Sequence, residues 1–260
     1  MPTDIVYEIN NSIKFIKRPE RIISLVPSIT ELLFDLNMGD AVKGITDYCI
    51  YPEREIKNKK RIGGPKSIDF DIVDKINPDL IISVKEENSK NQIIELAGKY
   101  NVLVLDIVDY KSALQGIKTV GDYCFCKNAA SVLVGDIEKS FAENRVNTTK
   151  ECVYLVWYNP IIVAGANTFI NSFMQKAGFK NIVKNSGYPK ITVEELKKMN
   201  PEFVLLSSEP FDFKDEHKYF FEKNITETNV IFVDGEMFSW YGSRMLKASK
   251  YFKKLEKWLY

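Results

Sequence analysis

Short, almost continuous apolar runs alternate with amphipathic segments along most of the chain. Runs rich in Ile, Val and Leu are typical of strands buried on both faces, whereas apolar positions three or four residues apart predict helices. In the first half the predicted strands are residues 21–26, 42–46, 80–84 and 102–105. The helices predicted between them are residues 30–36, 68–76 and 90–100.

The second half has the same alternation. Its predicted strands are residues 153–157, 203–207 and 230–233. Its predicted helices are residues 167–177, 192–199 and 243–259. Strands that alternate with helices indicate parallel sheets with helices packed on their faces, so the pattern predicts the α/β class.

One segment of the first half is repeated in the second half. Asp71 lies seven residues before Pro78, in an Asn-Pro-Asp turn that leads into a predicted strand. Glu194 likewise lies seven residues before Pro201, in an Asn-Pro-Glu turn that leads into another. One such turn is common local chemistry, but two in the same order predict two similar lobes.

The two lobes are expected at residues 1–111 and 151–260, with residues 112–150 between them. This middle stretch contains no convincing strand, and its pattern predicts helices at residues 112–123 and 129–146. A flexible hinge would be rich in Gly, Ser or Pro. The sequence therefore predicts two Rossmann-like α/β lobes with parallel sheets, joined by a rigid helical connector, with a ligand cleft between the lobes.

Composition narrows the class of protein. The 260 residues include 36 Lys and Arg against 35 Asp and Glu, so the net charge of +1 gives no basic excess for non-specific nucleic-acid binding. No apolar run approaches the roughly 20 residues of a membrane-spanning helix. The N-terminus has neither the basic start nor the apolar core of a secretory signal. Either a leader has been removed or the protein is cytoplasmic, and the sequence leaves both open.

The sequence offers little for catalysis or resident metal binding. His217 is the only histidine and lies in a strongly charged stretch, so we expect it at the surface, and a multi-histidine metal site is excluded. The cysteines form no Cys-x-x-Cys pair. Cys49, between two tyrosines, is either a partly buried thiol, which we favour, or a metal ligand. The glycine-rich phosphate-binding and Gly-x-Ser-x-Gly motifs are also absent.

Ligands of open α/β sheets bind beyond the carboxyl ends of the strands. The loops predicted there are rich in aromatic residues, which suits a large, flat, partly apolar ligand. Burial in a core explains Trp157 about as well as ligand binding does, but it explains the Phe238, Trp240 and Tyr241 cluster less well. The candidate ligand-binding residues are Ser28, Tyr48, Tyr51, Lys66, Trp157, Tyr158, Glu209, Trp240, Tyr241 and Arg244.

Several of these segments carry a family resemblance. Residues 18–33 (RPERIISLVPSITELL), the Asn-Pro-Asp-Leu-Ile-Ile run at 77–82, and residues 159–165 and 178–182 resemble the helical-backbone substrate-binding proteins of ABC importers. The resemblance covers about residues 18–258 and is greatest to the vitamin B12-binding branch. It implies a periplasmic or otherwise extracytoplasmic monomeric receptor without catalysis or a cofactor of its own. The implied ligand is a corrinoid, a ferric siderophore or haem.

The resemblance also implies a partner, an ABC permease dimer. In the family each lobe carries an acidic residue that docks on the permease, and the matching positions are Asp71 and Glu194. The same carboxylates also suit the first turn of a helix, where the helix dipole favours them, and both roles are compatible. By position, Tyr48, Trp157 and Trp240 would face the ligand. The alternative function is a cytosolic enzyme that handles metal chelates or tetrapyrroles on a similar two-lobed fold.

Overall fold

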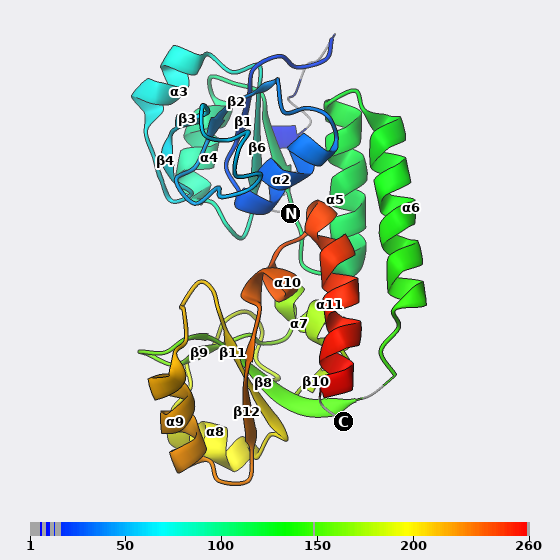
Figure 1. The fold of residues 1–260 in the computed structure, drawn as a ribbon. Coiled ribbons are helices and arrows are strands. Elements are labelled where there is room, and N and C mark those ends of the chain that lie inside the picture. Colours follow the sequence, from blue (N-terminus) through cyan, green and yellow to red (C-terminus); the bar gives the residue numbers. More distant parts are fainter. Residues whose placement is uncertain (1–5, 7–8, 11–12, 14–16, 148, 259–260) are drawn as a thin grey trace, which may run out of the picture. The chain divides into compact units, whose positions relative to one another are not determined.

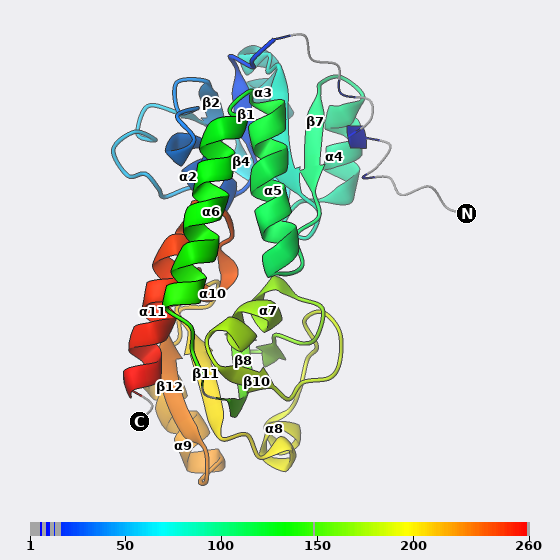
Figure 2. The same ribbon diagram turned by 90° about the vertical axis from the view of Figure 1, so that its right-hand side faces the viewer.

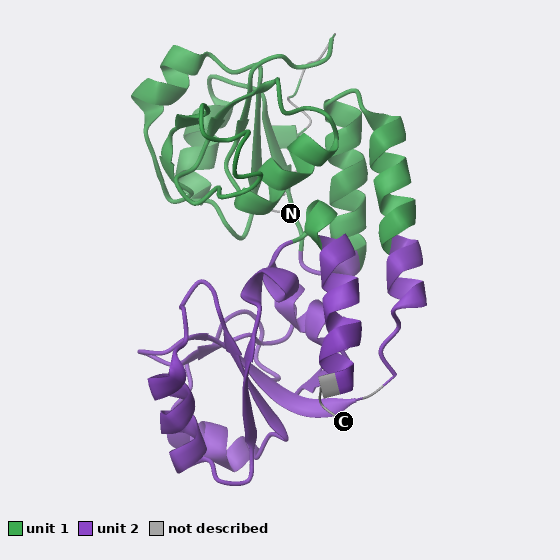
Figure 3. Cartoon of the chain, in the orientation of Figure 1, with its two compact units in different colours: residues 1–107, 111–137, 241–244 green, residues 108–110, 138–240, 245–260 purple. Residues whose placement is uncertain are grey.

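The computed structural model describes residues 6, 9–10, 13, 17–147 and 149–258. The first five residues, which bear on the question of a leader, and residue 259 of the last predicted helix lie outside this set. The chain forms two compact units (Figure 3). Unit 1 comprises residues 1–107, 111–137 and 241–244. Unit 2 comprises residues 108–110, 138–240 and 245–260.

Unit 1 is built on a five-stranded parallel sheet (Figure 1). The strand order is β3-β2-β1-β6-β7. The strands are β1 (Ile22–Ser24), β2 (Val42–Ile45), β3 (Lys60–Arg61), β6 (Leu80–Val84) and β7 (Val102–Leu105). Every residue of β1, β6 and β7 is buried, which explains why these strands read as continuous apolar runs.

Three helices and a small hairpin accompany this sheet. The helices are α2 (Pro27–Asp35), α3 (Phe70–Ile76) and α4 (Lys90–Ala97). The hairpin pairs β4 (Gly63–Gly64) with β5 (Ser67–Ile68) in antiparallel register. Gly63 has φ +87°, and a Cβ there would lie 2.3 Å from the Ser67 carbonyl oxygen. Only glycine fits this turn, so the hairpin depends on the sequence Gly-Gly.

The predicted helices of the middle stretch are confirmed as α5 (Tyr110–Tyr123) and α6 (Lys127–Glu143). The stretch expected to be a separate connector is divided, because residues 111–137 belong to unit 1 and residues 138–150 to unit 2. Close packing within unit 1 accounts for residues 111–137. A Cβ on Gly116 of α5 would lie 3.1 Å from Ile107, and one on Gly121 would lie 2.4 Å from the Cβ of Ala130 in α6. Figure 2 shows the two helices side by side.

Unit 2 contains a second sheet with the order β10-β8-β11-β12. Its strands are β8 (Lys150–Trp157), β9 (Ile162–Val163), β10 (Phe179–Asn181), β11 (Phe203–Ser207) and β12 (Asn229–Val233). The four strands of the main order run parallel, as predicted. The short strand β9 pairs antiparallel with β8, so this sheet is mixed rather than purely parallel.

The helices of unit 2 are α7 (Phe169–Lys176), α8 (Val193–Met199), α9 (Asp215–Asn224), α10 (Gly235–Ser239) and α11 (Met245–Trp258). The segment expected to be a loop with ligand-facing aromatics begins as α10, and Phe238 lies in the core. The Phe238 ring is fully buried, with its centroid 5.3 Å from that of Tyr154 and 4.9 Å from that of Phe252. A one-turn helix between two glycines has no periodicity that reveals it.

The internal repeat is confirmed in detail. Helices α3 and α8 each have seven residues. The side chain of the N-cap residue, Asp69 or Thr192, accepts a hydrogen bond from the backbone N–H three residues later at 3.1 Å. The C-cap residue is Asn77 or Asn200, with φ 48° and 47° in the left-handed region that asparagine tolerates. The same start and stop signals therefore produce the same helix twice.

Candidate functional site

The predicted ligand residues are divided between the units. In unit 1 they are Ser28, Tyr48, Tyr51, Lys66, Tyr241 and Arg244. In unit 2 they are Trp157, Tyr158, Glu209 and Trp240. The predicted residues also differ in solvent exposure. Four of them are buried, namely Ser28, Trp240, Tyr241 and Arg244.

Tyr48 is the most accessible aromatic candidate of unit 1. It follows β2, and 66% of its surface is exposed. A Cβ on Gly64 would lie 3.4 Å from Cε2 of Tyr48, so the ring lies against the backbone of the β4–β5 hairpin. Lys66, at the tip of that hairpin, is also exposed. The hairpin thus lies against one exposed aromatic ring, that of Tyr48, and carries one exposed cation, Lys66.

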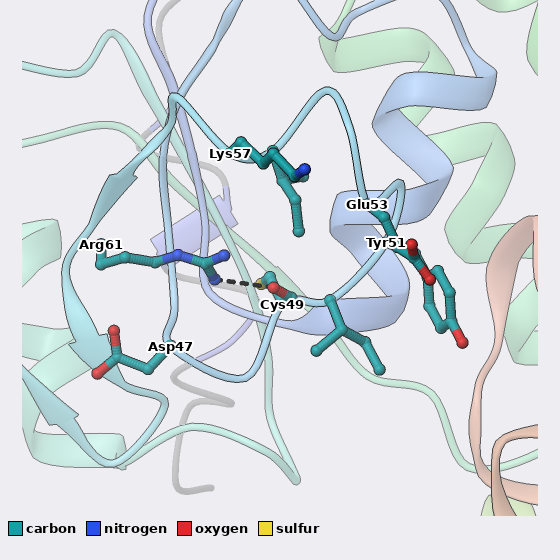
Figure 4. Close-up of a pocket in the computed structure, with 8 residues that line it drawn as sticks. Asp47, Cys49, Tyr51, Glu53, Lys57 and Arg61 are labelled. Carbon is teal, nitrogen blue, oxygen red and sulfur yellow. Dashed lines mark hydrogen bonds between the residues drawn. The ribbon is translucent and has the colours of Figure 1, made fainter.

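A pocket of about 390 Å³ lies in the loop after β2 (Figure 4). It is lined by Asp47, Cys49, Ile50, Tyr51, Glu53, Ile56, Lys57 and Arg61. Nη1 of Arg61 donates to the carbonyl oxygens of Thr46 and Cys49, each at 2.8 Å. Figure 4 shows the Arg61 guanidinium reaching across the loop to the Cys49 backbone. Arg61 therefore fastens the loop that carries Tyr48 and Tyr51.

Cys49 is fully buried. Its Sγ lies 3.1 Å from Oγ1 of Thr30 and 3.3 Å from Oγ1 of Thr46. Burial raises the pKa of the Cys49 thiol, although both threonine contacts oppose the rise. A buried, protonated thiol is a poor metal ligand, so the interpretation of Cys49 as a buried thiol is the one that its surroundings support.

Arg244 forms a buried ion pair within unit 1. Its Nε donates to Oε2 of Glu31 in α2 at 2.8 Å, and only 4% of Arg244 is exposed. The guanidinium carbon lies 4.2 Å from the centroid of the Tyr51 ring. Gly242, with φ +83°, brings this segment against α2, where a Cβ would lie 3.4 Å from the Ser28 carbonyl oxygen. These contacts fix the segment 241–244 to unit 1.

Sequence patterns did not identify Glu31. It lies among apolar residues in the middle of α2 and is itself buried. A carboxylate on the apolar side of a helix needs a partner of opposite charge. The position of Glu31 among apolar residues was therefore the signal from which a buried ion pair could have been inferred. Its partner is 213 residues away, so no local pattern identifies it.

Trp157 ends β8 and is 38% exposed. Its indole N–H donates to the Asn159 carbonyl oxygen at 3.2 Å. The Phe211 ring, which follows β11, meets the indole edge-on at a centroid distance of 5.3 Å. Phe211 was not predicted as a site residue, although it lies in a loop after a strand. Together the two rings form an aromatic surface at the carboxyl ends of β8 and β11.

Tyr158 and His217 pack against each other. Their ring centroids are 4.6 Å apart, and the Phe211 centroid lies 5.1 Å from that of His217. The prediction of a surface histidine is wrong, because only 12% of the His217 side chain is exposed. His217 is on the inner side of the amphipathic helix α9, and its Nδ1 accepts the Lys214 N–H at 2.9 Å. The neighbouring charges in the sequence belong to the outer side of that helix.

Glu209 is held in place by hydroxyl groups. Ser239 Oγ lies 2.5 Å from Glu209 Oε1. Ser207 Oγ accepts the Glu209 N–H at 3.2 Å and lies 2.5 Å from the Glu209 carbonyl oxygen. The Tyr154 hydroxyl lies 2.8 Å from the same Ser207 Oγ, and burial raises the pKa of Tyr154. The side chain of Glu209 is half-buried at the carboxyl end of β11.

Asp71 and Glu194 occupy equivalent positions. Each is the second residue of its helix, α3 or α8, and each is exposed. Both therefore lie in the first turn of a helix, as the interpretation based on the helix dipole requires.

Within the described part of the chain, no cluster of three or more His, Cys, Asp or Glu side chains is arranged to hold a metal ion. All four cysteines are free thiols. Among the same residues, no helix combines the length and hydropathy needed to cross a bilayer.

Comparison with known proteins bears on these features. The model of one protein family, described as periplasmic binding protein, matches residues 22–230. The chain belongs to the periplasmic binding protein family. An ABC transporter substrate-binding lipoprotein of Bacillus subtilis is 24% identical over 209 residues, which are 75% of this chain and 66% of that protein. A vitamin B12-binding protein of Pectobacterium carotovorum is 22% identical over 241 residues, or 89% and 86% of the two chains.

The fold is also that of solved structures. A periplasmic heme-binding protein of Pseudomonas aeruginosa superposes with a TM-score of 0.79 at 18% identity, over 91% of this chain and 92% of that one. This likeness confirms the predicted two-lobed α/β fold of the family.

Proposed function

We propose that this protein is the substrate-binding receptor of an ABC importer and that its ligand is a metal chelate, first of all a corrinoid. Membership in the family supports the receptor role. Two of the relatives are named for vitamin B12 or heme binding, which supports the ligand class. The receptor works outside the cytoplasm as a monomer, without catalysis and without a cofactor of its own.

The observation that carries the proposal is the exposure of large aromatic side chains beyond the strand ends. Tyr48 in unit 1 and Trp157 in unit 2 present rings that a flat, partly apolar ligand would cover. Lys66, Tyr51 and Glu209 supply polar contacts within their own units. The candidates Ser28, Trp240, Tyr241 and Arg244 are buried, and the Arg244 guanidinium lies 4.2 Å from the centroid of the Tyr51 ring.

The test is equilibrium binding of cyanocobalamin, haem and a ferric trishydroxamate, followed by quenching of tryptophan fluorescence and by calorimetry. We expect at least one chelate to bind, and Trp157→Ala and Tyr48→Ala each to weaken it by about 1–3 kcal/mol. Tyr219→Ala is the matched control, because Tyr219 is as exposed as Tyr48 but lies on α9. Absence of binding by every chelate, or equal losses in all three variants, would contradict the proposal.

The proposed docking residues are Asp71 and Glu194. Charge pairs at the rim of an interface mainly set orientation and encounter rate. Each single alanine variant should therefore slow permease binding, and the double variant should slow it more, while ligand affinity stays unchanged. The double variant Glu95→Ala/Glu227→Ala, which also removes one exposed carboxylate per unit, is the control. Loss of ligand affinity with docking intact would overturn this assignment.

A further inference from the structure

We propose that His217 is a positioning residue for the aromatic surface formed by Trp157 and Phe211, and that protonation of its imidazole weakens ligand binding at that surface. The inference rests on the proposed function and deepens it, because it adds regulation by pH to the same site. Its basis is a series of contacts within unit 2 that leads from the start of helix α9 to the exposed indole.

The first observation is the hydrogen bond at the start of α9. Lys214 is the N-cap residue of this helix, and its N–H donates to Nδ1 of His217 at 2.9 Å. A neutral imidazole has one nitrogen that accepts, whereas a protonated imidazole has a donor at both nitrogens. The contact therefore exists only while His217 is neutral, with its ring proton on Nε2.

The second observation is the packing of the imidazole behind the aromatic surface. Its centroid lies 5.1 Å from that of Phe211 and 5.6 Å from that of Phe213, at interplanar angles of 85° and 83°. The Phe211 ring in turn meets the Trp157 indole edge-on at 5.3 Å. Only 12% of the His217 side chain is exposed. His217 therefore links the start of α9 to the Phe211 ring and, through that ring, to Trp157.

The charged and titratable groups that face the imidazole do not replace this hydrogen bond. On α9, Glu216 Oε1 lies 3.8 Å from Nε2, but the Glu216 side chain is 81% exposed, and exposed ion pairs contribute little. In the loop after β11, Asp212 forms an ion pair with the Lys214 ammonium. In the loop after β8, Tyr158 packs its ring at a centroid distance of 4.6 Å.

Protonation of His217 has two local consequences. The Lys214 N–H loses its acceptor, and the ring gains a charge that is favoured in water rather than among aromatic side chains. We expect the first turn of α9 to loosen and the Phe211 ring to lose its fixed place against Trp157. A ligand that covers the indole must then order this surface, which costs binding free energy. Because histidine side chains change charge between about pH 5 and 8, affinity should fall as the pH is lowered through that range.

The first test measures affinity against pH. The probes are cyanocobalamin and a neutral ferric trishydroxamate, since neither gains or loses a proton in this range. We expect the wild-type protein to bind about fivefold more weakly at the acidic end than at the alkaline end, the size of effect of one hydrogen bond at a helix start. His217 is the only histidine of the chain, so no other imidazole contributes.

Two substitutions separate the hydrogen bond from the packing. His217→Asn keeps an acceptor, because its Oδ1 corresponds to Nδ1, and cannot be protonated. His217→Phe keeps a ring and removes the acceptor. Both variants should bind with an affinity independent of pH, and the Asn variant should bind more tightly than the Phe variant. A wild-type affinity that does not change with pH, or a Phe variant as tight as the wild type at the alkaline end, would overturn the inference.

The control for a histidine elsewhere on the helix is Tyr219→His in the His217→Asn background. Tyr219 is 66% exposed on α9, so this variant again has one histidine but lacks its contact with Lys214. Its affinity should stay independent of pH. A restored pH dependence would show that any imidazole on α9 has the same effect, and it would overturn the role of the hydrogen bond.

An NMR titration without ligand keeps this inference separable from the proposed function. The imidazole resonances belong to His217 alone. The Trp157 indole N–H, which donates to the Asn159 carbonyl oxygen at 3.2 Å, should shift with the same midpoint pH as the imidazole and should not shift in His217→Asn.

Different midpoints would overturn the inference and leave the receptor role standing. Failure of every chelate to bind would overturn the proposed function, whereas a shared midpoint would still support His217 as a positioning residue. The wild-type titrations need no substitution, so they decide between these outcomes even where a variant fails to fold.

Discussion

Strands β6 and β11 occupy the same place in the internal repeat, yet they end differently. After β6, the Asn88 side chain closes the turn. Its Oδ1 accepts the Val84 N–H at 2.9 Å, and its Nδ2 lies 3.4 Å from the Leu25 carbonyl oxygen and 3.1 Å from that of Pro65. Asn88 is 7% exposed, and its neutral amide makes these contacts only with residues of unit 1.

After β11, the Ser207 hydroxyl binds both backbone groups of Glu209, and the Ser239 hydroxyl donates to the Glu209 carboxylate. The helices before the two strands have the same length and the same kinds of cap. The repeat therefore duplicates the helix and the strand that follows it. The side chains that come after the two strands make different contacts. Four predictions test this contrast, from the largest expected effect to the smallest.

The largest effect concerns the buried ion pair between Glu31 and Arg244 in unit 1. Arg244→Met leaves the buried Glu31 carboxylate without its salt-bridge partner and should lower the free energy of unfolding by about 3–5 kcal/mol. Glu31→Leu/Arg244→Met removes both charges and should recover most of this loss. Urea denaturation of the single and double variants measures the difference. A double variant less stable than either single variant would contradict a structural role for the pair.

The second prediction compares the strand ends directly. Asn88→Ala removes the partner of buried backbone groups and should cost about 2–3 kcal/mol. Glu209→Ala should cost within about 1 kcal/mol, because half-buried groups regain contact with water. Thermal and urea denaturation decide the order, and equal losses would show that the two turns are equally structural.

The third prediction concerns the duplicated caps. Asp69→Ala and Thr192→Ala each remove a side-chain hydrogen bond at a helix start and should each cost about 1 kcal/mol. Similar losses are expected because the helices α3 and α8 have matching geometry. Asp71→Ala and Glu194→Ala, two positions further along, serve as controls with smaller losses. Unequal losses of stability at the two caps would show that the two helices share a backbone shape but not the energetic contribution of their caps.

The smallest effect concerns two tyrosines, one in each unit. The hydrogen bond from Tyr100 to Asp74, 2.6 Å long, raises the pKa of Tyr100 to about 12, with burial as a lesser cause. Burial raises the pKa of Tyr110 to about 12 as well. An ordinary tyrosine in the unfolded chain ionises near 10. The stability contributed by each group is therefore fully present below about pH 10 and is lost as the pH rises through about 12.

Asp74→Asn removes the main cause for Tyr100 alone. Titration of phenolate absorbance should then show one tyrosine ionising nearer to 10 while Tyr110 stays at its raised pKa. A shift of both groups would show that they are coupled, contrary to their separate physical causes.

Apolar periodicity predicted every long element of the fold except helix α9. The buried strands β6, β7 and β11 read directly as apolar runs, and the repeat was visible through its Asn-Pro turns. The two-residue strands β3, β4, β5 and β9 were missed because so short a run has no period. Helix α9 was missed because its outward-facing charges dominate the local sequence, which also led to the wrong prediction for His217.

The site was predictable in its loops but not in its contacts. Tyr48 follows a predicted strand and Trp157 ends one, and the exposure of both side chains agrees with a binding role. The partnership of Glu31 with Arg244 and the hydroxyl network around Glu209 depend on distances between segments far apart in the chain. Residue types alone carry no such distances.

The assignment of residues 241–244 to unit 1 has a consequence for synthesis. Unit 1 begins near the N-terminus, but its ion pair between Glu31 and Arg244 cannot form until 213 further residues have been made. At the usual rate of translation that interval is roughly 10–40 s. During this time the part of unit 2 up to Trp240 is synthesised. Unit 1 therefore cannot complete its packing until most of unit 2 has been made, and a chain released before Arg244 would lack the residue that completes it.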